Sequence, residues 1–109
     1  MNVLVAPDSY KECLSAAAVC AAMRRGIVSV CPDAQVITCP MADGGDGTLD
    51  VILDAADGDR QSVLTTDPLG NPIEAAFGYI ADSATAFIET AVACGLELMP
   101  PDQRNPLLT

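Results

Sequence analysis

The sequence predicts an α/β fold, with the parallel βαβα start of a Rossmann-like or flavodoxin-like domain followed by the antiparallel strands of a second unit. Up to about residue 60, short apolar runs alternate with segments whose apolar residues recur at helical spacing. After that point, strand-like runs follow one another with turn signals between them and no helical pattern. We therefore expect a change of architecture between residues 58 and 62.

Two short apolar runs predict the parallel strands. Residues 2–6 read NVLVA and stop at Pro7, which suits a strand buried on both faces of a sheet. Residues 35–39 read QVITC and form a second β-branched run. Because a helical segment separates these runs, we expect the two strands to lie parallel.

Helical spacing marks the segments that follow each strand. Ser15 is placed to cap a first helix that ends at Pro32, and its apolar face consists of Val19, Met23, Ile27 and Val30. Residues 48–56 form a second helix with outward-facing aspartates, and Gly58 is expected to stop it.

Three runs at residues 61–65, 73–80 and 85–89 predict the strands of the second unit. The turn signals DPLGNP and ADSA separate them. Antiparallel hairpins are the connection that such short turns allow. The second unit is therefore expected to begin as a β-meander.

The charge balance excludes several classes of function. The chain has 15 acidic and 5 basic residues and a net charge of −10, so nucleic acid is not an expected partner. There is no histidine, so the chain can supply no imidazole base or ligand. The longest apolar run, residues 16–23, is too short to span a membrane.

Cysteine usage and the start of the chain suggest a cytoplasmic protein. The five cysteines are an odd number without CxxC spacing, which predicts reduced, mostly buried thiols rather than disulfides or a zinc site. Residues 1–6 lack the basic region and the cleavage site of a signal peptide. We therefore expect a cytoplasmic location.

The glycine-rich segment MADGGDGTLD, residues 41–50, is the most specific feature. It follows a strand and opens a helix, which is where open α/β sheets bind ligands. Glycines allow close backbone approach, and a helix N-terminus attracts an anion. Asp43 and Asp46 repel anions themselves and fit better as Mg²⁺ ligands or as water-bridged partners of a metal-bound phosphate. The alternative is a tight turn in which Asp46 or Thr48 caps the helix.

The second candidate segment is PDSYKE, residues 7–12, which also follows a strand. Lys11 is the only lysine of the chain and can hold a phosphate or a substrate carboxylate as a point charge. The alternative is a solvated lysine paired with Asp8 or Glu12. Glu89 is a weaker candidate for a substrate or metal contact, and a surface carboxylate is its alternative.

Three segments together resemble the bacterial glycerate kinase family. They are VLVAPDSYKECLSA at residues 3–16, PMADGGDGT at 40–48, and TAFIETAVACGLELMPPDQRNPLLT at 85–109. Their order and spacing are similar to those in the N-terminal third of that family. Tyr10, Cys13 and Asp46 depart from the usual Phe, Ser and Glu of the family pattern.

The resemblance implies an ATP-dependent, Mg²⁺-dependent kinase that phosphorylates D-glycerate, with 2-phosphoglycerate favoured as the product. It implies that residues 1–60 begin a discontinuous α/β domain, that residues 61–109 begin an inserted domain, and that the remainder of a longer kinase chain is to be expected. By this resemblance Lys11 and Asp43 are catalytic, whereas the assignment of Asp43 and Asp46 as metal ligands rests on the chemistry of the loop, because Asp46 departs from the family pattern. The residues implied in substrate or phosphate binding are Asp8, Ser9, Gly44, Gly45, Gly47, Thr48, Glu89, Arg104 and Asn105.

A different class of function stays open beside this one. The 109-residue chain would then be a non-catalytic anion-binding module, or an inactive remnant that needs a partner chain. The unanchored apolar end Leu107, Leu108 and Thr109 and the uncovered edges of the predicted sheets favour a chain that is part of something longer.

Overall fold

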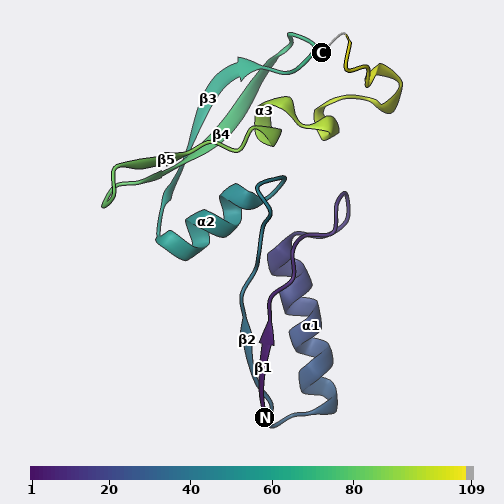
Figure 1. Ribbon diagram of the computed structural model, residues 1–109, viewed down its shortest axis with the longest axis vertical. Helices are drawn as coiled ribbons and strands as arrows, with labels where there is room; N and C mark the ends of the chain where they lie inside the picture. The colour runs from purple at the N-terminus through teal and green to yellow at the C-terminus, as the bar shows by residue number, and fades with distance from the viewer. Residues whose placement is uncertain (108–109) are drawn as a thin grey trace. The chain divides into compact units, whose positions relative to one another are not determined.

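The computed structural model describes residues 1–107, so the predictions for Leu108 and Thr109 lie outside the described residues. The chain divides into two compact units, Met1–Val51 and Ile52 onward. Figure 1 shows the course of the chain through both units. The division falls within a helix rather than near residue 60, and the domain boundary given above stays a prediction.

The first unit is a βαβ motif, as predicted. Strand β1 (Asn2–Val5) pairs in parallel with β2 (Gln35–Thr38), with Leu4 opposite Ile37. Helix α1 (Ala16–Val30) connects them and contacts both strands (Figure 1). The Ser15 hydroxyl accepts a hydrogen bond from the backbone N–H of Ala18 at 3.3 Å, which confirms the predicted cap.

The helix covers only one face of this two-stranded sheet. Val5 is buried against α1, whose Cys20 thiol donates to the Val5 carbonyl at 3.7 Å. On the other face Leu4 is 66% exposed and Ile37 is 62% exposed. The prediction that the first strand is buried on both faces is therefore wrong, because nothing within the first unit lies over the second face.

The predicted apolar face of α1 is correct only near its start. Val19 is buried and Ile27 is half-buried, but Met23 is exposed and Val30 is 80% exposed. A sheet of two four-residue strands is too small to cover the whole apolar face of a helix of 15 residues, so Met23 in its middle and Val30 at its end stay exposed.

Helix α2 (Thr48–Ala56) has the predicted bounds, with Leu49 and Leu53 buried. Its end differs from the prediction, because the positive φ of 50° belongs to Asp57 rather than to Gly58. Gly58 is needed for space: a Cβ there would lie 2.6 Å from Leu53 Cδ2 and 3.3 Å from the Tyr79 carbonyl oxygen.

The second unit contains the predicted antiparallel meander. Strands β3 (Asp59–Thr66), β4 (Pro72–Ile80) and β5 (Thr85–Phe87) pair in the order β3-β4-β5. The turn between β3 and β4 is built on Asp67, whose carboxylate accepts hydrogen bonds from Leu69 and Asn71, with Gly70 at a φ of 85°. The sequence signal DPLGNP therefore marks a real hairpin turn.

The last predicted strand is shorter than expected. It ends at Phe87, so Glu89 stands outside β5, just before the short helix α3 (Ala91–Cys94). Two single-turn 3₁₀ helices follow, at Leu96–Leu98 and Pro101–Gln103, and Met99 between them is buried. The Thr90 carbonyl accepts the backbone N–H groups of Ala93 and Cys94, and this helical turn prevents the strand from continuing.

The cysteines contradict the prediction of mostly buried thiols. All five are free, but only Cys20 is buried, and the other four are exposed in loops, at a helix end or just beyond a strand. Among residues 1–107 the eight buried apolar residues include only two leucines and one methionine, so the core is too small to enclose the other thiols. Within residues 1–107 no helix has the length and apolar character needed to cross a membrane.

Candidate functional site

The parallel pairing of β1 and β2 holds the two predicted loops together at the carboxyl ends of the strands. Beyond the sheet, the Cys39 N–H donates to the Val5 carbonyl at 2.8 Å, and the Met41 N–H donates to the Pro7 carbonyl at 3.0 Å. The backbones of segments 7–14 and 41–47 therefore start as neighbours at one edge of the sheet. This is the edge at which α/β proteins bind ligands.

The segment after β1 folds into a tight turn. The N–H of Tyr10 donates to the Leu14 carbonyl at 2.9 Å, and the Tyr10 carbonyl accepts from Cys13 and Leu14 at 3.0 Å. Lys11 is exposed within this turn. Asp8 turns its carboxylate to the backbone N–H of Ser9 at 2.5 Å. The turn thus leaves the Lys11 side chain exposed in the segment that follows Pro7.

The glycine-rich loop is held by bonds within itself. The Gly44 N–H donates to Thr48 Oγ1 at 3.1 Å, and the Gly45 N–H donates to Asp43 Oδ1 at 2.9 Å. The Gly47 carbonyl accepts the Val51 N–H at 3.3 Å, so Gly47 stands at the N-cap position of α2. The alternative of a tight turn predicted Asp46 or Thr48 as the N-cap of this helix, but neither of them is the N-cap residue.

Two of the loop glycines are required by the backbone. Gly44 has a φ of 101° and Gly47 a φ of 87°, which are conformations that other residues rarely adopt. Gly45 has no positive φ, but a Cβ there would lie 3.1 Å from Asp43 Oδ1. Gly45 therefore keeps room for the carboxylate of Asp43.

The carboxylates of the loop suit a metal that is held mainly by a bound phosphate. Asp43 is exposed and Asp46 is half-buried, and one oxygen of Asp43 already accepts the Gly45 N–H. Among residues 1–107 no three Cys, Asp or Glu side chains come together as a metal-binding group. Mg²⁺ characteristically takes one or two carboxylates together with water and substrate phosphates, so this donor set fits Mg²⁺ and not a cage made by the protein alone.

The remaining predicted site residues lie in the second unit. The guanidinium Nε of Arg104 donates to the Met99 carbonyl at 3.0 Å, and Asn105 Oδ1 accepts the Leu107 N–H at 3.0 Å. Glu89 is half-buried. Arg104 and Asn105 thus order the backbone of the segment after the second 3₁₀ helix, and their part in binding stays a prediction.

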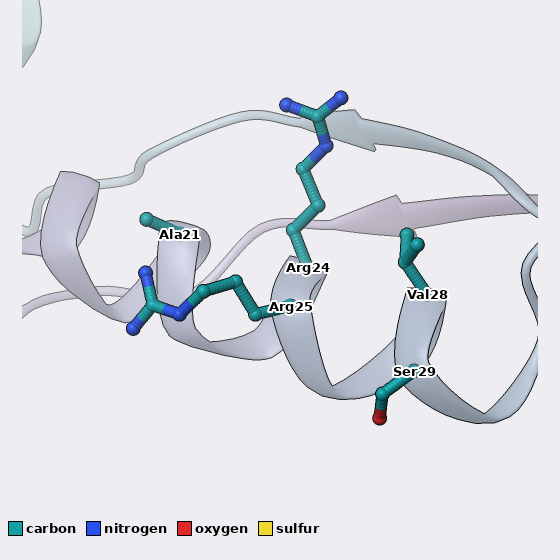
Figure 2. Close-up of a pocket in the computed structure, with 5 residues that line it drawn as sticks. All are labelled: Ala21, Arg24, Arg25, Val28 and Ser29. Atoms are coloured by element: carbon teal, nitrogen blue, oxygen red, sulfur yellow. The ribbon is translucent and has the colours of Figure 1, made fainter.

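A hollow of about 560 Å³ that sequence reasoning missed lies on the outer surface of α1 (Figure 2). The hollow is lined by Ala21, Arg24, Arg25, Val28 and Ser29. These residues recur at helical spacing, and that spacing is the sequence signal that could have indicated a common surface. Figure 2 shows the guanidinium groups of Arg24 and Arg25 pointing in different directions. They do not converge on a common point where one anion could sit.

The profile of the glycerate kinase family matches residues 3–109, which is nearly the whole chain. The chain belongs to the glycerate kinase family. Both candidate loops, the second unit and all but the first two residues of the first unit fall within the matched range. The family membership that the three sequence segments predicted is thereby confirmed.

Named glycerate kinases are similar to the chain throughout its length. It is 46% identical over 109 residues to the glycerate 2-kinase of Escherichia coli (strain K12), and 48% identical to the glycerate kinase of Bacillus subtilis (strain 168). It covers 29% and 28% of the length of these two proteins.

A solved structure of this family has the same fold. The crystal structure of a protein assigned as glycerate kinase 2 from Salmonella typhimurium LT2 matches 98% of the chain with a TM-score of 0.72 and 46% identity. The match covers 29% of that protein. The predicted α/β class with a parallel and an antiparallel sheet is thereby confirmed, and the chain spans less than a third of the relatives it matches.

Proposed function

We propose that this chain supplies the glycerate-binding loops of an ATP-dependent glycerate kinase. In the reaction, the γ-phosphoryl group passes from ATP to a hydroxyl oxygen of D-glycerate, and ADP and 2-phosphoglycerate are formed as the hydroxyl proton leaves. The observation that carries the proposal is the pair of backbone hydrogen bonds, Cys39 to Val5 and Met41 to Pro7, that brings the two family motifs to one sheet edge.

Each loop has a separate role in this proposal. The ammonium group of Lys11 holds the glycerate carboxylate or a phosphate, because it is the only lysine and is exposed beside the strand ends. Gly44, Gly45 and Gly47 let the substrate approach the backbone closely. Asp8, Ser9 and Thr48 offer side-chain oxygens to the hydroxyl groups of the substrate.

Mg²⁺ would be held by Asp43 and Asp46 together with the phosphates of ATP, and when bound it would neutralise charge on the transferring group. In the same site Asp43 is proposed to be catalytic. The Gly45 N–H holds the Asp43 carboxylate in position through the 2.9 Å hydrogen bond to its Oδ1. From the second unit, Glu89, Arg104 and Asn105 are proposed to complete the substrate contacts. The protein is proposed to act in the cytoplasm.

A second candidate function is supported by the small share of its relatives' length that the chain covers. Because the chain spans 29% of the E. coli glycerate 2-kinase, the chain by itself would be a non-catalytic anion-binding module that becomes active only with further polypeptide. In both candidates the same loops bind the same class of anion.

The test uses the chain alone and a fused protein in which the chain replaces its matched region of the E. coli glycerate 2-kinase. ADP formation from ATP and D-glycerate is measured for both, and phosphorus NMR identifies the phosphoglycerate product. We expect a 2-phosphoglycerate signal from the fused protein and none without Mg²⁺. A fused protein that folds but turns over no glycerate would contradict the proposal.

A further inference from the structure

Two sulfur atoms lie side by side just beyond the carboxyl end of β2. The Cys39 thiol donates to the Met41 thioether sulfur, and 3.9 Å separates the two atoms. Cys39 is exposed, and so is Met41, at 48%. The kinase function proposed above uses neither sulfur atom, so the pair is open to another role.

The backbone explains why these two side chains meet. The Cys39 N–H donates to the Val5 carbonyl at 2.8 Å. The Met41 N–H donates to the Pro7 carbonyl at 3.0 Å, so the parallel bonding continues past the end of β2. Residues two apart on an extended chain direct their side chains to the same side. The sheet therefore holds the thiol and the thioether together.

The separation of the sulfur atoms suits one metal ion between them. Metal–sulfur bonds are about 2.3 Å long in zinc thiolates, so two sulfur atoms on opposite sides of one ion lie about 4.6 Å apart. At 3.9 Å the angle at the ion would be roughly 115°, which leaves room for a third ligand. Because both side chains are exposed, solvent can supply that ligand.

The chemistry of the two donors selects the ion. Thiolate and thioether sulfur are soft ligands that favour Cu(I), whereas Mg²⁺ and Ca²⁺ take oxygen ligands. We propose that Cys39 and Met41 form a two-sulfur binding site for Cu(I) at the end of β2. On binding, the Cys39 thiol releases its proton to solvent, and both sulfur atoms donate an electron pair to the ion, whose oxidation state does not change.

Protection of the thiols from alkylation tests this site in the 109-residue chain. Cu(I) is supplied under nitrogen at free concentrations set by the chelator bathocuproine disulfonate, and iodoacetamide labelling is read by peptide mass spectrometry. Cys13, Cys31 and Cys94 are exposed thiols of the same chain and serve as internal references. We expect protection of Cys39 at a free Cu(I) concentration about ten-fold below that needed for the references, because two linked donors bind one ion together. Equal protection of all four thiols would overturn the proposal.

Substitution of the thioether distinguishes a two-sulfur site from a thiol that binds copper by itself. Met41→Leu keeps the side-chain volume and removes the sulfur, so the selective protection of Cys39 should disappear. Its labelling rate without copper should stay near that of the parent. Met23→Leu removes an exposed thioether from α1 and should leave the protection of Cys39 unchanged. Circular dichroism compares the fold of both variants with the parent. Selective protection of Cys39 in Met41→Leu would overturn the proposal as well.

Discussion

The backbone N–H of Gly44 donates to the hydroxyl oxygen of Thr48 at 3.1 Å, so the first residue of α2 holds the loop that precedes it. This bond leaves the hydroxyl proton of Thr48 able to donate to a ligand. We therefore predict two functions for the Thr48 hydroxyl, fixing the loop and contacting substrate. A serine at this position keeps the hydroxyl and removes only the methyl group.

In the fused protein, Thr48→Ala should lower kcat/KM by about 2- to 10-fold, the effect of losing one neutral hydrogen bond. Thr48→Ser keeps the oxygen and should stay near the parental value. Steady-state kinetics with D-glycerate checks both. Equal losses in the two variants would assign the effect to the methyl group instead of the hydroxyl.

Gly45→Ala should impair activity more than stability. The new Cβ would lie 3.1 Å from Asp43 Oδ1 and displace that carboxylate from the Gly45 N–H. Gly44→Ala is the matched control, because open space surrounds it but its φ of 101° makes alanine cost about 1–2 kcal/mol of folding stability. Melting temperature and kcat/KM are measured for both. A large drop in melting temperature for Gly45→Ala with activity retained would assign the loop a purely structural role.

Lys11→Ala should lower kcat/KM by roughly one to two orders of magnitude, because a charge-assisted hydrogen bond contributes about 1.5–3 kcal/mol. A raised KM for glycerate with kcat unchanged would indicate binding of the carboxylate. Equal falls in kcat and kcat/KM would indicate contact with the transferring phosphoryl group. Arg25→Ala, an exposed cation on α1, is the control and should change neither value. Unchanged kinetics in Lys11→Ala would show that Lys11 is a solvated surface residue and would contradict its role in binding.

The hairpin turn between β3 and β4 should weaken at low pH. The Asn71 side-chain amide donates to Asp67 Oδ2 at 2.9 Å and lowers the pKa of that carboxyl below its usual 3.8, with backbone N–H groups of Asn71 and Leu69 acting in the same direction. A carboxyl group whose pKa is lower in the folded state stabilises the fold at pH values above its pKa in the unfolded chain. This stabilisation is lost as the pH falls through the pKa of the folded state. The difference in melting temperature between the parent and Asn71→Ala should therefore shrink below about pH 4. A constant difference down to pH 2 would contradict this linkage.

Two glycine substitutions should change stability in opposite directions. Gly58→Ala should destabilise by about 1–3 kcal/mol, because its Cβ would lie 2.6 Å from Leu53 Cδ2 and 3.1 Å from Ile80 Cγ1. Gly26→Ala lies within α1 with nothing inside 4 Å, and should stabilise by about 1 kcal/mol. Thermal unfolding by circular dichroism measures both, and a shift of the same sign in the two variants would contradict the packing explanation.

The elements could be predicted where local chemistry decides them. Ser15 capped α1 as expected, and residues 48–56 gave the bounds of α2, because caps, glycines and helical spacing act over a few residues. The Asp67 turn was visible for the same reason. Burial was predicted less well, since it depends on distant polypeptide: Leu4 reads as a buried residue in the sequence and is exposed in the structure.

The candidate site was predictable as two loops but not in its internal bonds. The position of both loops after parallel strands followed from the βαβ pattern. The engagement of the Gly44 and Gly45 N–H groups with Thr48 and Asp43 did not, because it depends on the φ values that each glycine adopts. Arg104 and Asn105 came from the family resemblance alone, whereas Glu89 was also a candidate from its place at the end of a predicted strand.

The pairing of β1 with β2 also determines when the loop pair can form during synthesis. Asn2 pairs with Gln35, and the last bond between the loops joins Pro7 to Met41, so all these contacts lie early in the chain. Closing a short stretch of chain loses little entropy, and a ribosome adds roughly 5–20 residues per second. We expect the two strand ends to meet without waiting for the antiparallel meander to fold, because its strands take no part in these contacts. The loop pair is then a surface that the nascent chain can present to small molecules and chaperones ahead of the meander that follows it in the sequence.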